Sequence, residues 1–230
     1  ILISGRGSNM EAIVKTAQKD AWPAKIAAVI SNRSDASGLD FARSHGIPVA
    51  VLDHKNFKDR MEFDRQLAEL IDSYSPDLVV LAGFMRILTG DFVRHYEGKL
   101  LNIHPSLLPL FPGLHTHEQA LEAGVAVHGA TVHFVTEALD HGPMVIQASV
   151  PVLPSDDADT LAKRVLKQEH IIYPRAVRWF IDNRISIDQG RVLVNPPELY
   201  SLLPLRERAD RDTDRKPLKA LMRPPLRTNA

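Results

Sequence analysis

Cysteine does not occur in the 230 residues of this sequence. Its absence excludes disulfides, thiolate zinc sites and a cysteine nucleophile together. Long apolar runs are missing too: no stretch of roughly 18 apolar residues occurs, so the sequence predicts no membrane-spanning helix and no membrane partner. No secretory signal is visible, although the chain begins at Ile1, and a targeting segment removed before that residue stays an open alternative. These absences favour a cytoplasmic protein.

A net charge is also missing, since lysines and arginines equal aspartates and glutamates in number. The charges are nevertheless unevenly spread, because residues 204–230 carry eight basic side chains against four acids. This segment contains prolines and no aromatic residue among its charges. We therefore interpret residues 196–230 as a basic extension that is partly disordered or loosely docked, and favour this over a nucleic-acid-binding arm. No nucleic-acid partner is expected.

Apolar runs and helical patterns alternate through the first half of the chain. Residues 77–81 form a run that is continuously apolar after Asp77, which is typical of a strand buried on both faces of a parallel sheet. Residues 57–74 repeat apolar side chains at helical spacing. Further strands are expected at 1–3, 25–30, 48–52 and 99–103, and further helices at 10–17 and 39–43. This alternation predicts a doubly wound α/β fold, an open and mostly parallel sheet with helices on both faces.

The pattern changes in the second half, where strands follow each other without an intervening helix. Two runs joined by a polar turn predict strands added to the sheet by a different connection. The expected elements are strands at 130–135 and 144–151, a helix at 159–182 kinked or interrupted near Pro174, and closing strands at 185–187 and 191–194. One domain over residues 1–195, followed by the extension, is the simplest division of the chain.

A glycine loop lies between the first expected strand and the first helix, with the sequence Gly-Arg-Gly-Ser-Asn at residues 5–9. A helix amino terminus leaves backbone N–H groups unpaired, and glycines let an anion approach them. A dinucleotide fingerprint would need a glycine at Met10, and the lysine of a triphosphate loop is missing. The loop therefore predicts a site for a single phosphate. The alternative is a turn that only caps the helix.

Asn102 and His104 lie at the carboxyl end of an expected strand, where open α/β sheets place their ligands. Strand alternation points both side chains to the same side of the sheet. Asp140 falls in the turn between the two later strands, and a carboxylate beside His104 would fix the tautomer of the ring. An amide, an imidazole and a carboxylate suit acyl transfer to an amine, because donors stabilise the developing oxyanion. The alternative is a core histidine and a turn aspartate without chemistry.

Two other histidines, His115 and His117, bracket a threonine and could suggest a metal pair. No cysteine and no HExxH helix supports that reading, so no metal is expected. The surrounding segment comprises residues 107–128. It is interpreted either as a mobile loop that closes over substrate or as a fixed loop.

Taken together, six motifs resemble the glycinamide ribonucleotide formyltransferase family. Each is moderately specific, but their joint occurrence in the family's order, from residue 1 to about 195, is very specific. The motifs are SGRGSN at 4–9, LAGFMRIL at 81–88, NIHPSLLP at 102–109, FPGLHTH at 111–117, HGATVHFV at 128–135 and QEHIIYP at 168–174.

This resemblance implies a Rossmann-like fold and formyl transfer from the co-substrate 10-formyltetrahydrofolate to the amine of glycinamide ribonucleotide, in purine synthesis and without a metal. It implies that Asn102, His104 and Asp140 are catalytic, with His104 as the acid. The ribonucleotide residues would be Gly7, Ser8, Asn9 and Glu169. The folate residues would be Arg60, Met85, Arg86, Ile87, Leu88 and Asn102.

Departures from the family pattern are few. His141 stands where a glycine is familiar, and Arg6 adds a charge to the glycine loop. Formyltetrahydrofolate hydrolases and methionyl-tRNA formyltransferases resemble the chain around the same trio and are the nearest rivals. A folate- or nucleotide-binding regulator without turnover is a rival of another class. Whether the chain forms a homodimer is left open.

Overall fold

The computed structural model describes residues 1–197, so nearly all of the expected extension 196–230 lies outside the described residues. A seven-stranded sheet forms the centre, in the order β3-β2-β1-β4-β5-β6-β7. Neighbouring strands are parallel from β3 through β5, whereas β6 pairs antiparallel with both β5 and β7. The strands are β1 (Leu2–Ile3), β2 (Val29–Ser31), β3 (Val49–Val51), β4 (Val79–Leu81), β5 (Leu100–His104), β6 (Val127–Phe134) and β7 (Met144–Pro151). The expected mostly parallel α/β sheet with added strands is confirmed.

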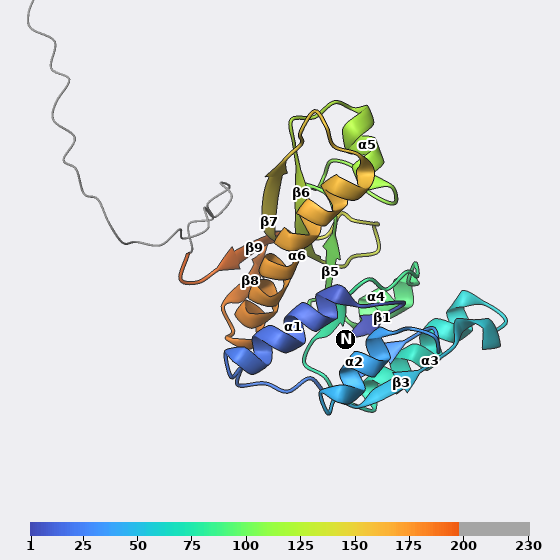
Figure 1. Ribbon diagram of the computed structural model, residues 1–230. Coiled ribbons are helices and arrows are strands. Elements are labelled where there is room, and N and C mark those ends of the chain that lie inside the picture. The colour runs from blue at the N-terminus through green and yellow to red at the C-terminus, as the bar shows by residue number, and fades with distance from the viewer. Residues whose placement is uncertain (198–230) are drawn as a thin grey trace, which may run out of the picture.

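Helices cover both faces of this sheet, and Figure 1 shows α1 and α6 side by side on one of them. The longest helix begins at a capping box in which Asp157 and Thr160 each bond the other's backbone N–H. A hairpin of β8 (Ile185–Asp188) and β9 (Arg191–Val194) follows it. The helices are α1 (Ser8–Lys19), α2 (Gly38–Ser44), the 3₁₀ turn η1 (His54–Asn56), α3 (Arg60–Asp72), α4 (Gly90–His95), α5 (Thr116–Glu122) and α6 (Ala158–Ile181).

The two faces of the sheet belong to two separate apolar cores. One core joins α1, α2, α5 and α6 to the side of β5 that carries Leu101 and Ile103. The other joins α3 and α4 to the opposite side of β5, where Leu100 lies. Because successive strand residues alternate between faces, Asn102 and His104 point to the α3–α4 side of the sheet. Strand alternation therefore decides on which face the candidate catalytic side chains stand.

Several expected elements differ from the structure in their extent. Helix α3 begins at Arg60 rather than at 57, because the Asp59 side chain accepts from the Glu62 N–H and caps it there. The strand expected at 25–30 is shorter and starts at Val29. No interruption occurs at Pro174, which lies inside a continuous α6.

The segment 107–128 was expected to be a loop, and this is wrong in part. It contains the short helix α5, which is fixed to the core by buried Thr116 and Ala120. Helix α4 was not expected either. Both helices have fewer than eight residues, too few for an apolar period to stand out.

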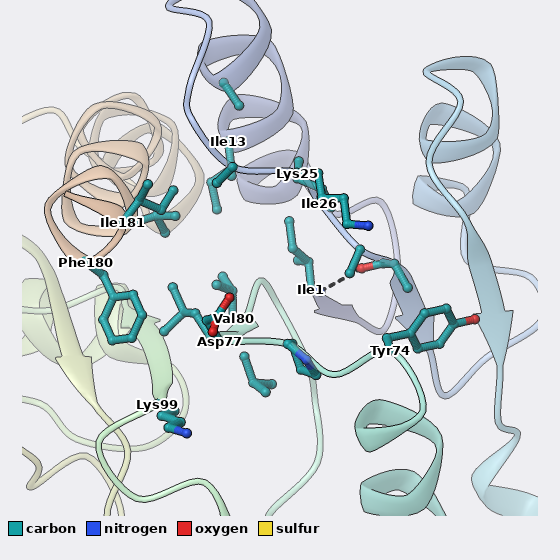
Figure 2. Close-up of a pocket in the computed structure, with 18 of the residues that line it drawn as sticks. Ile1, Ile13, Lys25, Ile26, Tyr74, Asp77, Val80, Lys99, Phe180 and Ile181 are labelled. Carbon is teal, nitrogen blue, oxygen red and sulfur yellow. Dashed lines mark hydrogen bonds between the residues drawn. The ribbon is translucent and has the colours of Figure 1, made fainter. Parts of the chain in front are cut away.

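A cavity of about 610 Å³ opens at the amino ends of β1, β2 and β4. Figure 2 shows Ile13 of α1, Asp77 before β4 and Phe180 of α6 among the residues that line it. It lies at the opposite end of the sheet from His104, so it takes no part in the candidate site. Among the described residues, no helix is long and apolar enough to cross a membrane.

Candidate active site

Four polar side chains stand on one face of the β5–β6 strand pair. Asn102 lies directly opposite His133, and His104 directly opposite Thr131. Side chains that face each other across an antiparallel pair lie on the same side of the sheet and within contact distance. The pairing thus adds a threonine and a second histidine to the two residues that the sequence predicted.

His104 is held by acceptors at both of its ring nitrogens. Its Nε2 lies 2.9 Å from the carbonyl oxygen of Phe111, and its Nδ1 lies 3.4 Å from Oδ2 of Asp140. A carbonyl oxygen only accepts hydrogen bonds, so Nε2 carries a proton and donates it. The nitrogen that faces the carboxylate, and is left for chemistry, is therefore Nδ1. Both side chains are 6% exposed.

The turn that carries Asp140 is shaped by its own backbone. Asp140 has a φ of 55°, and two residues later a Cβ on Gly142 would lie 1.7 Å from the Phe134 carbonyl oxygen. Only glycine fits so close an approach. The backbone N–H of Gly113 donates to Oδ2 of Asp140 over 2.9 Å. The turn is thus pressed against β6, which holds the carboxylate of Asp140 towards His104.

A second histidine completes this group. The Nε2 of His133 lies 3.4 Å from the amide nitrogen of Asn102 and 3.7 Å from Oδ1 of Asp140. Burial lowers the pKa of His133, because the surrounding protein disfavours its charged form. His133 therefore contacts Asn102 and Asp140, so the three predicted side chains lie close together.

The glycine loop stands at the switch point of the sheet, where β1 and β4 are neighbours although their connections run in opposite directions. Gly7 has a φ of 67°, and a Cβ there would lie 3.1 Å from the Ile3 side chain. No side chain caps the first turn of α1, so its first backbone N–H groups have no side-chain acceptor. A cavity of about 460 Å³ lies over this loop, with Arg6, Arg33 and Arg86 among its lining. An uncapped helix start with nearby cations suits an anion.

Two of the predicted ribonucleotide residues contact each other. The amide nitrogen of Asn9 donates to Oε2 of Glu169 over 2.7 Å, and both side chains are buried. Burial raises the pKa of Glu169, and the hydrogen bond from Asn9 opposes this in part. The side chain of Asn9 is thus turned towards Glu169 of α6, while Asn9 also lines the cavity over the glycine loop.

The predicted folate residues lie mostly in the loop between β4 and α4. Met85 and Ile87 are among the exposed large apolar side chains, whereas Leu88 packs against the α3–α4 core. The guanidinium of Arg86 lies over the Phe63 ring, 5.4 Å from its centroid. Because Leu81 is paired with Asn102, this loop leaves the sheet at the level of the predicted trio.

Two contacts fix the ends of this loop. The N–H of Met85 donates to the Ser4 hydroxyl over 2.8 Å, and the N–H of Thr89 donates to Oδ2 of Asp64 over 2.6 Å. Arg60 lies on the surface one turn before Asp64 on α3. The exposed apolar side chains of Met85 and Ile87 therefore lie between two fixed ends of this loop.

A sequence model with the description "Formyl transferase" matches residues 1–177. The chain belongs to the formyl transferase family. The match covers the glycine loop, the β4–α4 loop, the trio and Glu169, so every predicted site residue lies inside it.

Known members of the family include close relatives of this chain. It is 49% identical to phosphoribosylglycinamide formyltransferase of Escherichia coli, covering 87% of this chain and 97% of the relative. The solved structure of glycinamide ribonucleotide transformylase 1 from Symbiobacterium toebii has a TM-score of 0.81 and 47% identity, covering 84% of this chain and 91% of that one. A formyltetrahydrofolate deformylase from Pseudomonas syringae has a TM-score of 0.78 and 30% identity, covering 84% and 64% respectively.

Two further histidines of this formyl transferase, His117 and His128, form a pair near His104. His117 lies 3.2 Å from buried His128, and burial lowers the pKa of His128 to about 4. His115 is exposed at the start of α5. Within residues 1–197, no group of three or more histidine, aspartate or glutamate side chains is placed to hold a metal ion. The His115–His117 pair therefore gives no support to a metal centre.

Two contacts at the site could not be taken from the sequence. The Phe111 carbonyl that orients His104 is a backbone group in a loop. Every residue has such a group, so the type of residue 111 does not predict this contact. The contact between His133 and Asn102 depends on the register of an antiparallel pair. The alternating polar residues in the HGATVHFV motif were the available signal, since they place Thr131 and His133 on one face.

Proposed function

We propose that this protein transfers the formyl group of 10-formyltetrahydrofolate to the amine of glycinamide ribonucleotide. One observation carries the proposal: an amide, an imidazole and a carboxylate converge beside an uncapped helix start that suits a phosphate. The relatives named as phosphoribosylglycinamide formyltransferases support the same substrates. The reaction belongs to purine synthesis.

The chemistry is an acyl transfer without a covalent enzyme intermediate. The ribonucleotide amine attacks the formyl carbon, and a tetrahedral centre forms with negative charge on the former carbonyl oxygen. The amide N–H of Asn102 and the Nδ1–H of protonated His104 are the donors for that oxygen. Collapse then breaks the bond between the carbon and N10 of the folate. The amine loses one proton and N10 gains one. The products are therefore the formylated ribonucleotide and tetrahydrofolate, with no net gain or loss of protons.

His104 acts as the general acid in this sequence through Nδ1. Its Nε2 proton is committed to the Phe111 carbonyl, so the ring cannot turn its other nitrogen to the substrate without losing that bond. Oδ2 of Asp140 lies 3.4 Å from Nδ1 and its negative charge stabilises the imidazolium, while the Phe111 carbonyl keeps the ring in this orientation. The acid is therefore positioned from two directions before any substrate binds.

The ribonucleotide extends from the glycine loop towards the trio. Its phosphate accepts from the backbone N–H groups that follow Gly7, at Ser8 and Asn9, where the start of α1 favours negative charge. Glu169 accepts hydrogen bonds from the ribose hydroxyls, held in place by Asn9. No metal takes part.

The folate is proposed to bind in a cleft along the β4–α4 loop. Its pterin ring packs between the apolar side chains of this loop, backbone groups read the ring edge, and Asn102 reaches the formyl group. Arg60 lies on the folate side as a partner for the carboxylates of the glutamate tail. The residues proposed for this cleft are Arg60, Met85, Arg86, Ile87, Leu88 and Asn102.

The rival function is hydrolysis of the same folate, since a deformylase shares the fold. The anion cavity over the glycine loop favours a phosphorylated acceptor. Incubating the enzyme with 10-formyltetrahydrofolate, with and without glycinamide ribonucleotide, separates the two functions. Release of tetrahydrofolate that depends on the ribonucleotide supports transfer; equal release without it supports hydrolysis and overturns the proposal.

The enzyme is proposed to act in the cytoplasm as a one-carbon transferase, with residues 1–195 as the catalytic unit. A chain ending at residue 197 should then keep wild-type turnover. A homodimer is also proposed, and sedimentation of the full chain tests it. No nucleic acid or membrane is needed by the proposed reaction.

A further inference from the structure

The neighbourhood of His133 suggests more than packing. On β6, His133 faces Asn102 of β5 on one side and Met144 of β7 on the other. The β6–β7 register shifts between Val132 and His133, so that β7 has one extra residue at this point. Such bulges turn a side chain away from the regular pleat and are common beside active sites. His133 is 2% exposed, so its partners are fixed by the fold rather than by solvent.

The tautomer of His133 follows from its partners. Its Nδ1 lies 2.9 Å from the Phe134 carbonyl oxygen, which only accepts, so Nδ1 carries the proton. Burial lowers the pKa of His133, which favours the neutral ring, although the bond to the Phe134 carbonyl and the charge of Asp140 oppose this in part. Nε2 then has a free lone pair. Oδ1 of Asp140 is itself an acceptor and lies 3.7 Å away, whereas the Asn102 amide nitrogen, at 3.4 Å, is a donor.

We propose that His133 is a positioning residue that accepts one N–H of the Asn102 amide at Nε2 and so leaves the other N–H facing the formyl oxygen. An asparagine amide has two orientations that differ little in shape, and the flipped one would present an oxygen to the developing oxyanion. That orientation would also place an oxygen against the lone pair of Nε2. His133 therefore selects the donor orientation of Asn102 before the folate binds.

The inference deepens the proposed function and rests on it. The test measures kcat and both KM values of the full-length enzyme for His133→Leu, which has no acceptor, and for His133→Gln, whose side-chain oxygen replaces Nε2. His133→Leu should lower kcat by about 10- to 100-fold, since the oxyanion donor is no longer oriented. Both KM values should stay within about twofold, because neither substrate loses a contact. His133→Gln should recover kcat to within about threefold of wild type.

A double-mutant cycle shows whether His133 acts through Asn102. In the Asn102→Ala background, His133→Leu should lower kcat by less than about twofold, because the group it orients is gone. Thermal unfolding confirms that each variant is folded, and His133→Asn, too short to reach Asn102 from the position of Nε2, replaces the leucine variant if that fails to fold. Equal losses for the glutamine and leucine variants, or independent effects in the cycle, overturn the inference. Absence of turnover in the wild type would instead overturn the proposed function.

Discussion

The side-chain amide of Asn9 donates a hydrogen bond to the carboxylate of Glu169, with 2.7 Å between nitrogen and oxygen. This contact joins the glycine loop at the start of α1 to the middle of α6, across 160 positions of the chain. It couples the group proposed to hold the phosphate to the group proposed to hold the ribose. The proposed phosphate-binding and ribose-binding groups are therefore held in a fixed relation before the ribonucleotide binds.

Replacing Asn9 by alanine tests this coupling. The backbone N–H of residue 9 remains, but Glu169 loses its donor. A hydrogen bond to a charged group contributes roughly 1.5–3 kcal/mol, so KM for the ribonucleotide should rise about tenfold or more. KM for the folate should not change. Steady-state kinetics with each substrate varied checks this. An equal rise in both KM values would contradict the assignment of Asn9 and Glu169 to the ribonucleotide part of the site.

Glu169 also predicts how stability depends on pH. Because its pKa is raised in the folded state, the ionised form is disfavoured there relative to the unfolded chain. The contribution of the protonated Glu169 side chain to the free energy of unfolding is fully present below the unfolded pKa of about 4.3. It is lost as pH rises through the raised pKa of the folded state. Glu169→Gln should therefore become more stable relative to wild type as pH rises, while losing ribonucleotide affinity. Denaturant unfolding of both proteins at several pH values measures this. A difference in free energy of unfolding between Glu169→Gln and wild type that does not change with pH would contradict the prediction.

The buried His128 predicts a loss of stability in acid. Its pKa falls from 6.5 to about 4 on folding, so the unfolded chain binds more protons between these values. Stability should decline as pH falls through this window, by on the order of 3 kcal/mol at 1.36 kcal/mol per pKa unit. His128→Gln should flatten the decline, whereas His115→Gln, at an exposed position of the same region, should not. Denaturant unfolding of the three proteins between pH 7 and pH 4 checks this, and equal slopes would contradict it.

Gly7 offers a prediction with a matched control. Alanine at Gly7 must adopt a φ of 67° and place its Cβ 3.1 Å from Ile3, whereas alanine at Gly46, with a φ of 70°, meets nothing within 4 Å. Both substitutions should cost about 1–2 kcal/mol of stability through the left-handed backbone. Only Gly7→Ala should raise KM for the ribonucleotide, by about tenfold, because it shifts the phosphate N–H groups. Similar KM values for the two variants would argue against a phosphate at this loop.

Much of the fold could be predicted from local patterns. Buried parallel strands are short apolar runs, and the run at 144–151 coincides with β7. The long helices show a 3.6-residue period, which places α1, α3 and α6 within a few residues. Helices α4 and α5 were missed because two buried residues in each make no period. Their stability comes from tertiary packing rather than from their own sequence.

The site was less accessible to sequence reasoning. Strand alternation placed Asn102 and His104 on one side correctly. The approach of Asp140 needed the resemblance to a family, because nothing local says how a turn 36 residues after His104 folds back. The orientation of Asn9 towards Glu169 and the register that sets His133 against Asn102 are long-range contacts, which no local pattern encodes.

The central claim is that His104 supplies the acid for ribonucleotide-dependent formyl transfer. The most direct measurement is the rate of tetrahydrofolate release by His104→Ala at saturating 10-formyltetrahydrofolate and glycinamide ribonucleotide. The account predicts a fall in kcat of about a hundredfold or more, with thermal unfolding close to that of the wild type. A folded His104→Ala enzyme with near-normal turnover would contradict it.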